Sequence, residues 1–248
     1  MPVAEQLMTQ SVDYPGEGMT LRGFLARPET PNPRSAVIVI HEWWGLNDHM
    51  KDVTQRFARE GYVALAPDLY SRLPAPAGAR GGPGGNKVTK DPNEAAKLME
   101  SLSSQSALKD LNATARWLKQ QPFVDPLKLG VVGFCMGGTF ALMAASHNSD
   151  IKAAVPFYGQ VPPSDSIKYL VAPILYIHGG QDAWIVKREA DRLAQALAQY
   201  GRPGEVKSYP GCGHAFFNDT RPEAYRPAEA KDAWERTLAF LARHLQGV

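Results

Sequence analysis

The chain has 248 residues, of which 44% are hydrophobic, and its 27 basic residues nearly balance 25 acidic ones. This length fits one α/β domain or two small ones, and the balanced charge argues against a nucleic-acid-binding surface. The sequence shows no apolar run long enough to span a bilayer, no secretory signal pattern and too few cysteines for a disulfide framework. We therefore expect a cytoplasmic protein with reduced thiols and no membrane contact.

Hydrophobic patterns along the chain alternate between strand-like and helix-like segments. Short apolar runs predict strands at 19–28, 36–40, 62–66, 129–132, 151–156, 174–178 and 205–209. Helical spacing predicts helices at 50–60, from 91 or 93 to about 120, and at 139–145, 186–200 and 228–245. Residues 71–91 are rich in Pro and Gly and are interpreted as a long loop rather than a linker. The alternation predicts a single α/β domain over residues 1–248, a mostly parallel sheet with helices on both faces.

The segment after the apolar run 129–132 carries a nucleophilic side chain. Cys135 stands between Gly133 and Gly137, directly before a predicted helix. A strand, a sharp turn and a helix in this order form the nucleophile elbow of α/β-hydrolases, where Ser is the usual residue. The small neighbours accommodate the strained turn, and the positive end of the helix favours a thiolate. We predict that Cys135 is a catalytic nucleophile and that the backbone N–H of Met136 belongs to an oxyanion hole.

Two loops that follow later strands supply an acid and a base. The strand at 174–178 leads to Asp182, and the strand at 205–209 leads to His214. The order nucleophile, acid, histidine is the chain order of the α/β-hydrolase triad. In this interpretation His214 moves the proton of the sulfur, and Asp182 orients the imidazole and stabilises its charged form. Each residue alone also fits a purely structural role, Asp182 as a turn cap and His214 as a packed core histidine.

A further motif follows the first long buried strand. Residues 41–45 read His-Glu-Trp-Trp-Gly, and the loop at this position normally donates an oxyanion-hole N–H, a role that falls to Trp43. Glu42 is unexpected there, and pairing with a nearby Arg at the surface is its structural alternative. No group of His, Cys, Asp and Glu has convincing metal-ligand spacing, and nothing indicates an organic cofactor. We therefore expect neither a metal nor a cofactor.

Together these motifs resemble those of the dienelactone hydrolases, or carboxymethylenebutenolidases. The resemblance runs from about residue 19 to 245 and rests on HEWWG at 41–45, PDLY at 67–70, GFCMGG at 133–138, GGQD at 179–182 and GCGH at 211–214. Members of this family are α/β-hydrolases that open enol lactones by acyl transfer to a cysteine. The resemblance implies that Cys135 is the nucleophile, His214 the general base and acid, and Asp182 its orienter. It further implies that Glu42 takes the thiol proton when substrate enters, so that the thiolate forms on demand.

The substrate-binding residues of that family are only partly matched. Its members bind a substrate carboxylate through arginines, and Asn218 stands where one of these is expected. Three arginines could substitute, Arg72, Arg80 and Arg221, and each is by default a solvated surface charge. Cys212 is interpreted as a packing residue, with a bridge to Cys135 as the alternative. The candidates for substrate contact are Arg72, Arg80, Trp44, Phe216 and Asn218. We expect a small ester or lactone as substrate, without assigning dienelactone itself.

A different class of function stays open at this point. A non-catalytic ligand-binding or thiol redox-sensing protein could keep the same fold and use Cys135 as a reactive thiol. Asp182 and His214 argue against it, because a thiol sensor needs neither an orienting acid nor an oxyanion hole. A cysteine peptidase or acyltransferase on this fold fits the same spacing. The balanced charge is compatible with a monomer or a weak homodimer.

Overall fold

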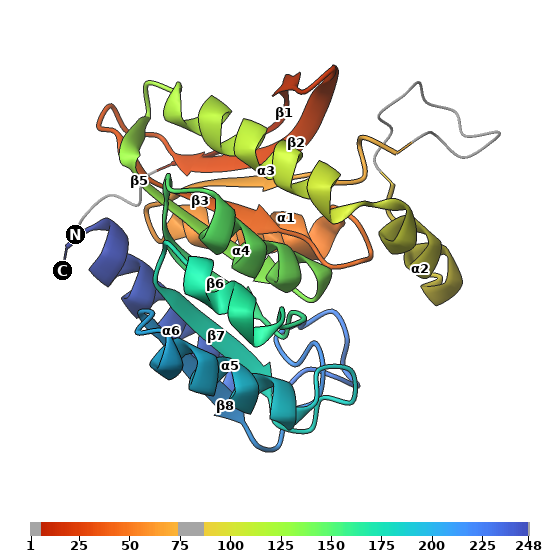
Figure 1. Ribbon diagram of the computed structural model, residues 1–248. Coiled ribbons are helices and arrows are strands. Elements are labelled where there is room, and N and C mark those ends of the chain that lie inside the picture. The colour runs from red at the N-terminus through yellow and green to blue at the C-terminus, as the bar shows by residue number, and fades with distance from the viewer. Residues whose placement is uncertain (1–5, 74–86, 248) are drawn as a thin grey trace. The chain divides into compact units, whose positions relative to one another are not determined.

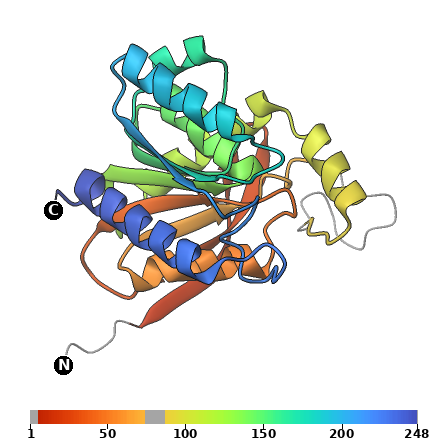
Figure 2. The same ribbon diagram turned by 90° about the horizontal axis from the view of Figure 1, so that it is seen from below.

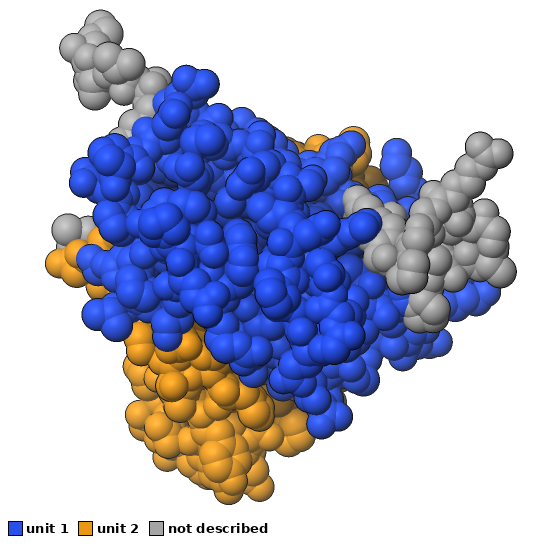
Figure 3. Space-filling model, turned by 90° about the horizontal axis from the view of Figure 1, so that it is seen from above, with its two compact units in different colours: residues 1–129 blue, residues 130–248 orange. Residues whose placement is uncertain are grey.

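The computed structural model describes residues 6–73 and 87–247 of the chain. The chain divides into two compact units, residues 1–129 and 130–248, and each is described by itself (Figure 3). Strand β5 (Val124–Phe134) begins in the first unit and ends in the second. The expectation of a single domain over 1–248 stays a prediction.

The strands of the first unit pair in the order β1-β2-β4-β3 (Figure 1). Their bounds are β1 (Leu7–Gly16), β2 (Met19–Pro28), β3 (Arg34–Ile40) and β4 (Val63–Pro67). β1 and β2 form an antiparallel hairpin that turns at Gly18, whose φ of 72° suits glycine. β2 pairs antiparallel with β4, whereas β3 and β4 are parallel and almost wholly buried. Strand β1 was not predicted, because most of its side chains are exposed and leave no hydrophobic pattern in the sequence.

The first unit contains three helices, α1 (Asp48–Arg59), α2 (Pro92–Ser101) and α3 (Ser104–Lys119). Two of them cover its strands, since α1 packs on β2 and β4 and α3 packs on β1. The prediction of one helix from 91 or 93 to about 120 is wrong. Leu102 is extended, with ψ of 104°, and the Ser103 hydroxyl accepts the N–H of Ser106 at 3.1 Å. A second N-cap therefore ends one helix and begins the next.

The second unit continues with parallel strands. β6 (Ile151–Phe157), β7 (Ile174–Gly179) and β8 (Gly204–Tyr209) follow β5 in the order β5-β6-β7-β8. The β6–β7 and β7–β8 pairs are both parallel, so the carboxyl ends of these strands lie at one edge. Loops at that edge are where α/β proteins place their functional side chains.

Helices lie on both faces of these parallel strands (Figure 2). The elements are α4 (Met136–His147), the 3₁₀ helix η1 (Ser164–Tyr169), α5 (Lys187–Gln199) and α6 (Pro227–Leu245). Beneath the carboxyl edge, the Phe134 ring packs against Phe157 at 4.7 Å and Phe217 at 5.2 Å between centroids. This aromatic cluster anchors the loops that carry the candidate site. In the described part of the chain, no helix has the length and hydrophobicity that a membrane crossing requires.

Candidate active site

Cys135 occupies a strained turn between β5 and α4. Its backbone has φ of 55° and ψ of −118°, and helix α4 begins at the next residue. A non-glycine residue held in such a region costs on the order of 1–3 kcal/mol, which the surrounding fold must offset. Gly133 makes the turn possible, since a Cβ there would lie 1.9 Å from the carbonyl oxygen of Gly137. This geometry is a sharp strand-to-helix turn, and the role of Cys135 as a nucleophile stays a prediction.

Neighbouring backbone groups hold the turn in place. The N–H of Cys135 donates to the carbonyl of Phe157 on β6 at 3.1 Å, and the N–H of Gly138 donates to the Cys135 carbonyl at 2.9 Å. A Cβ on Gly138 would lie 2.4 Å from the Phe157 oxygen, so β6 and the start of α4 approach as only glycine permits. Helix α4 begins directly after Cys135, so the positive end of its dipole lies at this residue. The oxyanion-hole role of the Met136 N–H stays a prediction.

Asp182 and His214 meet beyond the ends of β7 and β8. The Nδ1 atom of His214 donates to Oδ2 of Asp182 at 2.7 Å. The other carboxylate oxygen, Oδ1, accepts the N–H groups of Trp184 at 2.8 Å and Ile185 at 2.9 Å. Asp182 is 4% exposed, so its charge is satisfied by hydrogen bonds rather than by solvent. The remaining ring nitrogen of His214, Nε2, is buried.

Two glycines bring the acid loop and the histidine loop into contact. The N–H of Gly180 donates to Tyr209 and that of Gln181 donates to Cys212, each at 2.8 Å. A Cβ on Gly179 would lie 2.5 Å from the carbonyl oxygen of Gly213, and one on Gly180 would lie 2.7 Å from the Cα of Pro210. Glycine at positions 179 and 180 therefore lets the backbone before Asp182 pack directly against the backbone of the loop that carries His214.

The hydrogen bond between His214 and Asp182 shifts the pKa of both side chains. Burial lowers the pKa of His214, but the hydrogen bond to Asp182 and the neighbouring Cys135 thiol outweigh burial and raise the pKa to about 10. Burial raises the pKa of Asp182, and the hydrogen bond and charge of His214 reverse this effect, so that the pKa is lowered overall. The structure thus brings Cys135, His214 and Asp182 together, and it favours an imidazolium at His214.

Two aromatic residues that the sequence analysis did not single out flank the imidazole. The Tyr158 ring lies 4.9 Å from the His214 ring between centroids, and the Trp184 ring lies 5.1 Å away in a stacked arrangement. Tyr158 is almost fully buried and has a positive φ of 38°, a second strained residue, here next to the imidazole. Its position directly after strand β6, near the end of the apolar run at 151–156, is the signal that could have identified it.

The His-Glu-Trp-Trp-Gly motif lies in the first unit, in a loop whose backbone is held by hydrogen bonds. The buried His41 accepts the N–H of Leu69 at Nε2 (3.1 Å) and donates from Nδ1 to the Glu42 carbonyl (2.6 Å). Burial lowers the pKa of His41 to about 4, so the ring stays neutral. The Tyr70 hydroxyl donates to the Trp43 carbonyl at 2.9 Å. Glu42 is 1% exposed, which argues against the surface pairing considered for it.

The candidates for substrate contact have different surroundings. Phe216 and Asn218 are buried, and the Asn218 side chain accepts the hydroxyl of Thr220 at 2.7 Å. Trp44 is half-buried and packs edge-on against Trp43, with centroids 4.8 Å apart. Arg80 lies outside the described residues.

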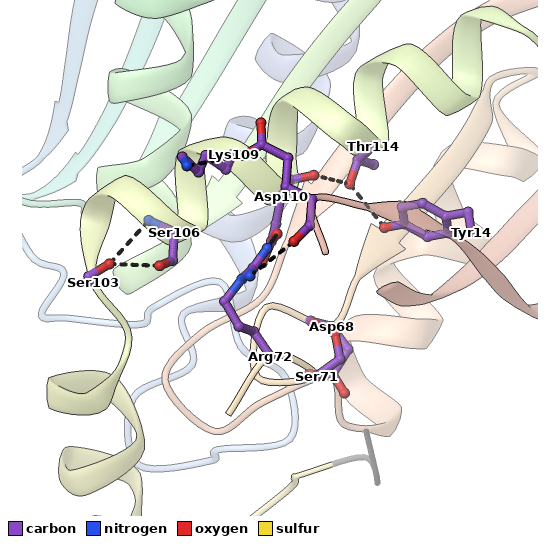
Figure 4. A network of polar contacts seen from close by, with 10 residues as sticks. Tyr14, Asp68, Ser71, Arg72, Ser103, Ser106, Lys109, Asp110 and Thr114 are labelled. Carbon is purple, nitrogen blue, oxygen red and sulfur yellow. Dashed lines mark hydrogen bonds and ion pairs between the residues drawn. The ribbon is translucent and has the colours of Figure 1, made fainter. Parts of the chain in front are cut away.

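Arg72 is engaged within the first unit (Figure 4). Its Nε donates to Oδ2 of Asp110 at 3.0 Å, and a second, shorter contact joins Nη2 to Oδ1. Asp110 is 1% exposed, and its backbone carbonyl also accepts the hydroxyl of Thr114, which is bonded to Tyr14. A buried carboxylate thus holds this guanidinium, and a substrate role for Arg72 stays a prediction.

The remaining histidine and cysteine near the loops are structural. His178 accepts the Ser208 hydroxyl at Nδ1 (3.0 Å) and donates from Nε2 to the Ile185 carbonyl (2.7 Å), which supports the turn after Asp182. Cys212 is a free thiol with no exposed surface, and burial raises its pKa to about 11. Among the residues that the structure describes, no cluster of His, Cys, Asp and Glu could hold a metal ion.

Comparisons with known proteins cover nearly the whole chain. The model of the dienelactone hydrolase family matches residues 21–245. "Protein usf" of Aquifex pyrophilus is 36% identical over 247 residues, which cover 96% of this chain and 100% of that protein. "Putative carboxymethylenebutenolidase" of Saccharolobus solfataricus is 37% identical over 261 residues, which cover 95% and 99%. A crystal structure named "Putative Dienelactone Hydrolase", from Klebsiella pneumoniae, is similar with a TM-score of 0.86 and 32% identity, covering 96% and 99%.

These similarities confirm the resemblance on which the sequence analysis relied. They also confirm the predicted fold class, the α/β-hydrolase fold, and the predicted class of enzyme, a carboxylic ester hydrolase. The chain belongs to the dienelactone hydrolase family.

Proposed function

We propose that the protein hydrolyses small carboxylic esters and lactones through a thioester on Cys135. The observation that supports this most directly is the His214–Asp182 hydrogen bond of 2.7 Å, next to a cysteine with φ of 55° at the start of a helix. A ligand-binding or redox-sensing protein has no use for a buried acid that orients the imidazole. The name of the Saccharolobus relative, a carboxymethylenebutenolidase, supports a lactone among the substrates.

The proposed reaction has two acyl-transfer steps. Glu42 accepts the thiol proton of Cys135 when substrate binds, and the thiolate Sγ attacks the substrate carbonyl. The tetrahedral oxyanion accepts the N–H of Met136, and its collapse breaks the ester bond as the imidazolium of His214, stabilised by Asp182, donates its Nε2 proton to the leaving alkoxide. In a lactone, this alcohol stays attached to the acyl group. His214, now neutral, deprotonates a water molecule that attacks the thioester, and collapse of this second intermediate releases the acid and the thiolate, which recovers its proton from Glu42.

Glu42 and Trp43 enter this proposal through the family resemblance. Glu42 would accept the thiol proton when substrate binds, and the backbone N–H of Trp43 would be a second oxyanion donor. A buried carboxylate is a suitable proton acceptor for such a step, and the hydrogen bonds of His41 and Tyr70 hold the backbone of this loop. Each oxyanion donor contributes on the order of 3 kcal/mol to stabilisation of the transition state.

The test is turnover of a small panel of substrates, namely a dienelactone, simple aryl esters and a cyclic carbonate ester. Cys135→Ala is expected to abolish cleavage, and Glu42→Gln is expected to lower the rate of acylation. Intact-mass spectrometry after mixing with an aryl acetate should show one acetyl adduct in the wild type and none in Cys135→Ala. Cys212→Ala is the matched control and should keep both adduct and rate. Unchanged turnover in Cys135→Ala would overturn the proposal.

We further propose that the enzyme works in the cytoplasm as a monomer or weak homodimer with reduced thiols. Both cysteines are free in the structure, and Cys212 is buried away from oxidants. Light scattering across a range of concentrations tests the state of association, and the result that contradicts it is a stable higher oligomer.

A further inference from the structure

Trp184 is an exposed aromatic residue that the proposed mechanism does not use. Its side chain is 59% exposed, although its ring stacks on the catalytic imidazole of His214, with centroids 5.1 Å apart and planes 30° apart. The His214 side chain itself is only 16% exposed. Single exposed apolar side chains are common on protein surfaces, so the informative feature of Trp184 is its stacking on His214 rather than its exposure.

The backbone of Trp184 is held by the same carboxylate that orients the imidazole. Its N–H donates to Oδ1 of Asp182 at 2.8 Å, while Oδ2 of that carboxylate accepts Nδ1 of His214 at 2.7 Å. The N–H of Ile185 shares Oδ1, and its carbonyl accepts Nε2 of His178 at 2.7 Å. Hydrogen bonds to Asp182 and His178 therefore fix the backbone of the turn at Trp184 and Ile185. This fixed backbone, together with ring stacking, keeps the indole against the imidazole.

Two aromatic rings of different character lie against the imidazole. Tyr158 is 1% exposed and its ring is tilted by 57° relative to the imidazole, whereas the Trp184 ring stacks on the imidazole with 30° between the planes. The face of an indole attracts a cation more strongly than other side-chain rings do, and it distinguishes a charged imidazolium from a neutral imidazole. During acyl transfer His214 becomes charged each time it accepts a proton, so the stack strengthens at that moment.

We propose that Trp184 is a positioning residue that acts through His214, its indole face stabilising the imidazolium and holding the plane of the ring for proton transfer. This inference rests on the proposed function. Within the described part of the second unit, the titratable groups that face the ring are Asp182 before α5, Cys135 at the start of α4 and Tyr158 after β6.

The first experiment titrates His214 by NMR in a Cys135→Ala background, where the thiol no longer couples to the imidazole. Trp184→Phe keeps an aromatic face, and Trp184→Leu keeps an apolar cover without one. We expect the leucine variant to lower the pKa of His214 by about half a unit, and the phenylalanine variant to stay close to the tryptophan. The same pKa in the leucine variant and its parent would overturn the inference. His214→Gln assigns the resonance, and circular dichroism confirms that each variant is folded.

The second experiment measures steady-state kinetics with Cys135 present. We expect Trp184→Leu to lower kcat by about threefold with little change in KM, and Trp184→Phe to restore most of it. A change confined to KM that differs between esters would place the indole against the substrate and overturn the positioning role. The NMR titration needs no turnover, so a failure of the proposed hydrolase function is distinguishable from a failure of this inference.

Discussion

His214 donates its Nδ1 proton to Oδ2 of Asp182 at 2.7 Å, within a contact between two loops that glycine alone permits. Because a carboxylate only accepts, this bond sets the tautomer and leaves Nε2 as the nitrogen that can take a proton. The bond also raises the pKa of His214 and lowers that of Asp182, so the pair is most stable when both are charged.

Asp182→Asn should reduce kcat by a factor of about 10³–10⁴. The amide donates to Nδ1 and so favours the tautomer with the proton on Nε2, which cannot accept a proton from the attacking water. The measurement is kcat and kcat/KM of an aryl ester across pH. Asp191→Asn is the control, because Asp191 is an exposed partner of Lys187 on α5. A loss of the same size in both variants would contradict the assigned role.

The stability of the fold should depend on pH through His214. Its pKa is raised from 6.5 to about 10, so the stabilisation from the charged ring is fully present below pH 6.5 and lost as pH rises through about 10. Denaturant unfolding of the wild type and His214→Gln tests this between pH 6 and 10.5. We expect the difference in unfolding free energy to be largest at low pH and to shrink toward pH 10. If the difference in unfolding free energy grows with pH, the pKa of His214 is lowered by folding rather than raised, and the prediction is wrong.

Asp182 makes the complementary contribution in acid. Its pKa is lowered from 3.8, so the stabilisation from the ionised carboxylate is present above pH 3.8 and lost as pH falls through the lower, folded-state value. Acid unfolding followed by tryptophan fluorescence should show Asp182→Asn to be less sensitive to pH than the wild type in this range. Equal acid sensitivity of the two proteins would show that other carboxylates dominate.

Gly179→Ala should separate the acid loop from the histidine loop. The new methyl group would lie 2.5 Å from the carbonyl oxygen of Gly213, a clash of backbone against side chain that cannot relax by rotation. We expect a loss of stability on the order of 1–3 kcal/mol and a larger loss of activity. Gly211→Ala is the matched control, since nothing lies within 4 Å of a Cβ there. Urea unfolding and kcat/KM measure the two effects, and equal behaviour of the variants would contradict the packing argument.

The two cysteines should differ in reactivity toward alkylating agents in the native protein. Cys212 is fully buried and burial raises its pKa to about 11, so thiolate is scarce and inaccessible at pH 8. Iodoacetamide labelling followed by mass spectrometry should give a single adduct, and none in Cys135→Ala. Labelling in denaturant is the control and should modify both cysteines. A native adduct on Cys212 would show that its loop opens.

Arg72→Leu should affect stability rather than substrate preference. The substitution leaves Asp110, which is 1% exposed, without its guanidinium partner, and we expect a loss on the order of 2 kcal/mol because Arg72 is itself partly exposed. Arg22→Leu, which breaks an exposed pair with Asp13, is the control and should cost little. Unfolding free energy is the measurement. A normal stability with a changed KM for anionic esters would instead support the predicted substrate contact.

Much of the candidate site could be predicted because its signals are local. Cys135 is recognisable from the glycines that a strained turn needs, and Asp182 and His214 from loops after buried strands. The helix expected from 91 or 93 to about 120 was wrong for an equally local reason. The Ser103 hydroxyl caps the start of a new helix, so the preceding helix ends there. The spacing of hydrophobic residues carries no information about such a cap.

The sequence by itself determined the family and the candidate residues Cys135, Asp182 and His214, because each stands in a short motif of residues that are neighbours along the chain. Only the tertiary structure decided what surrounds the imidazole, since Tyr158 and Trp184 reach His214 from separate loops. It also decided that Arg72 is held by the buried Asp110. Burial and partners of a charged or aromatic side chain arise from packing between distant segments, and no pattern along one segment encodes them.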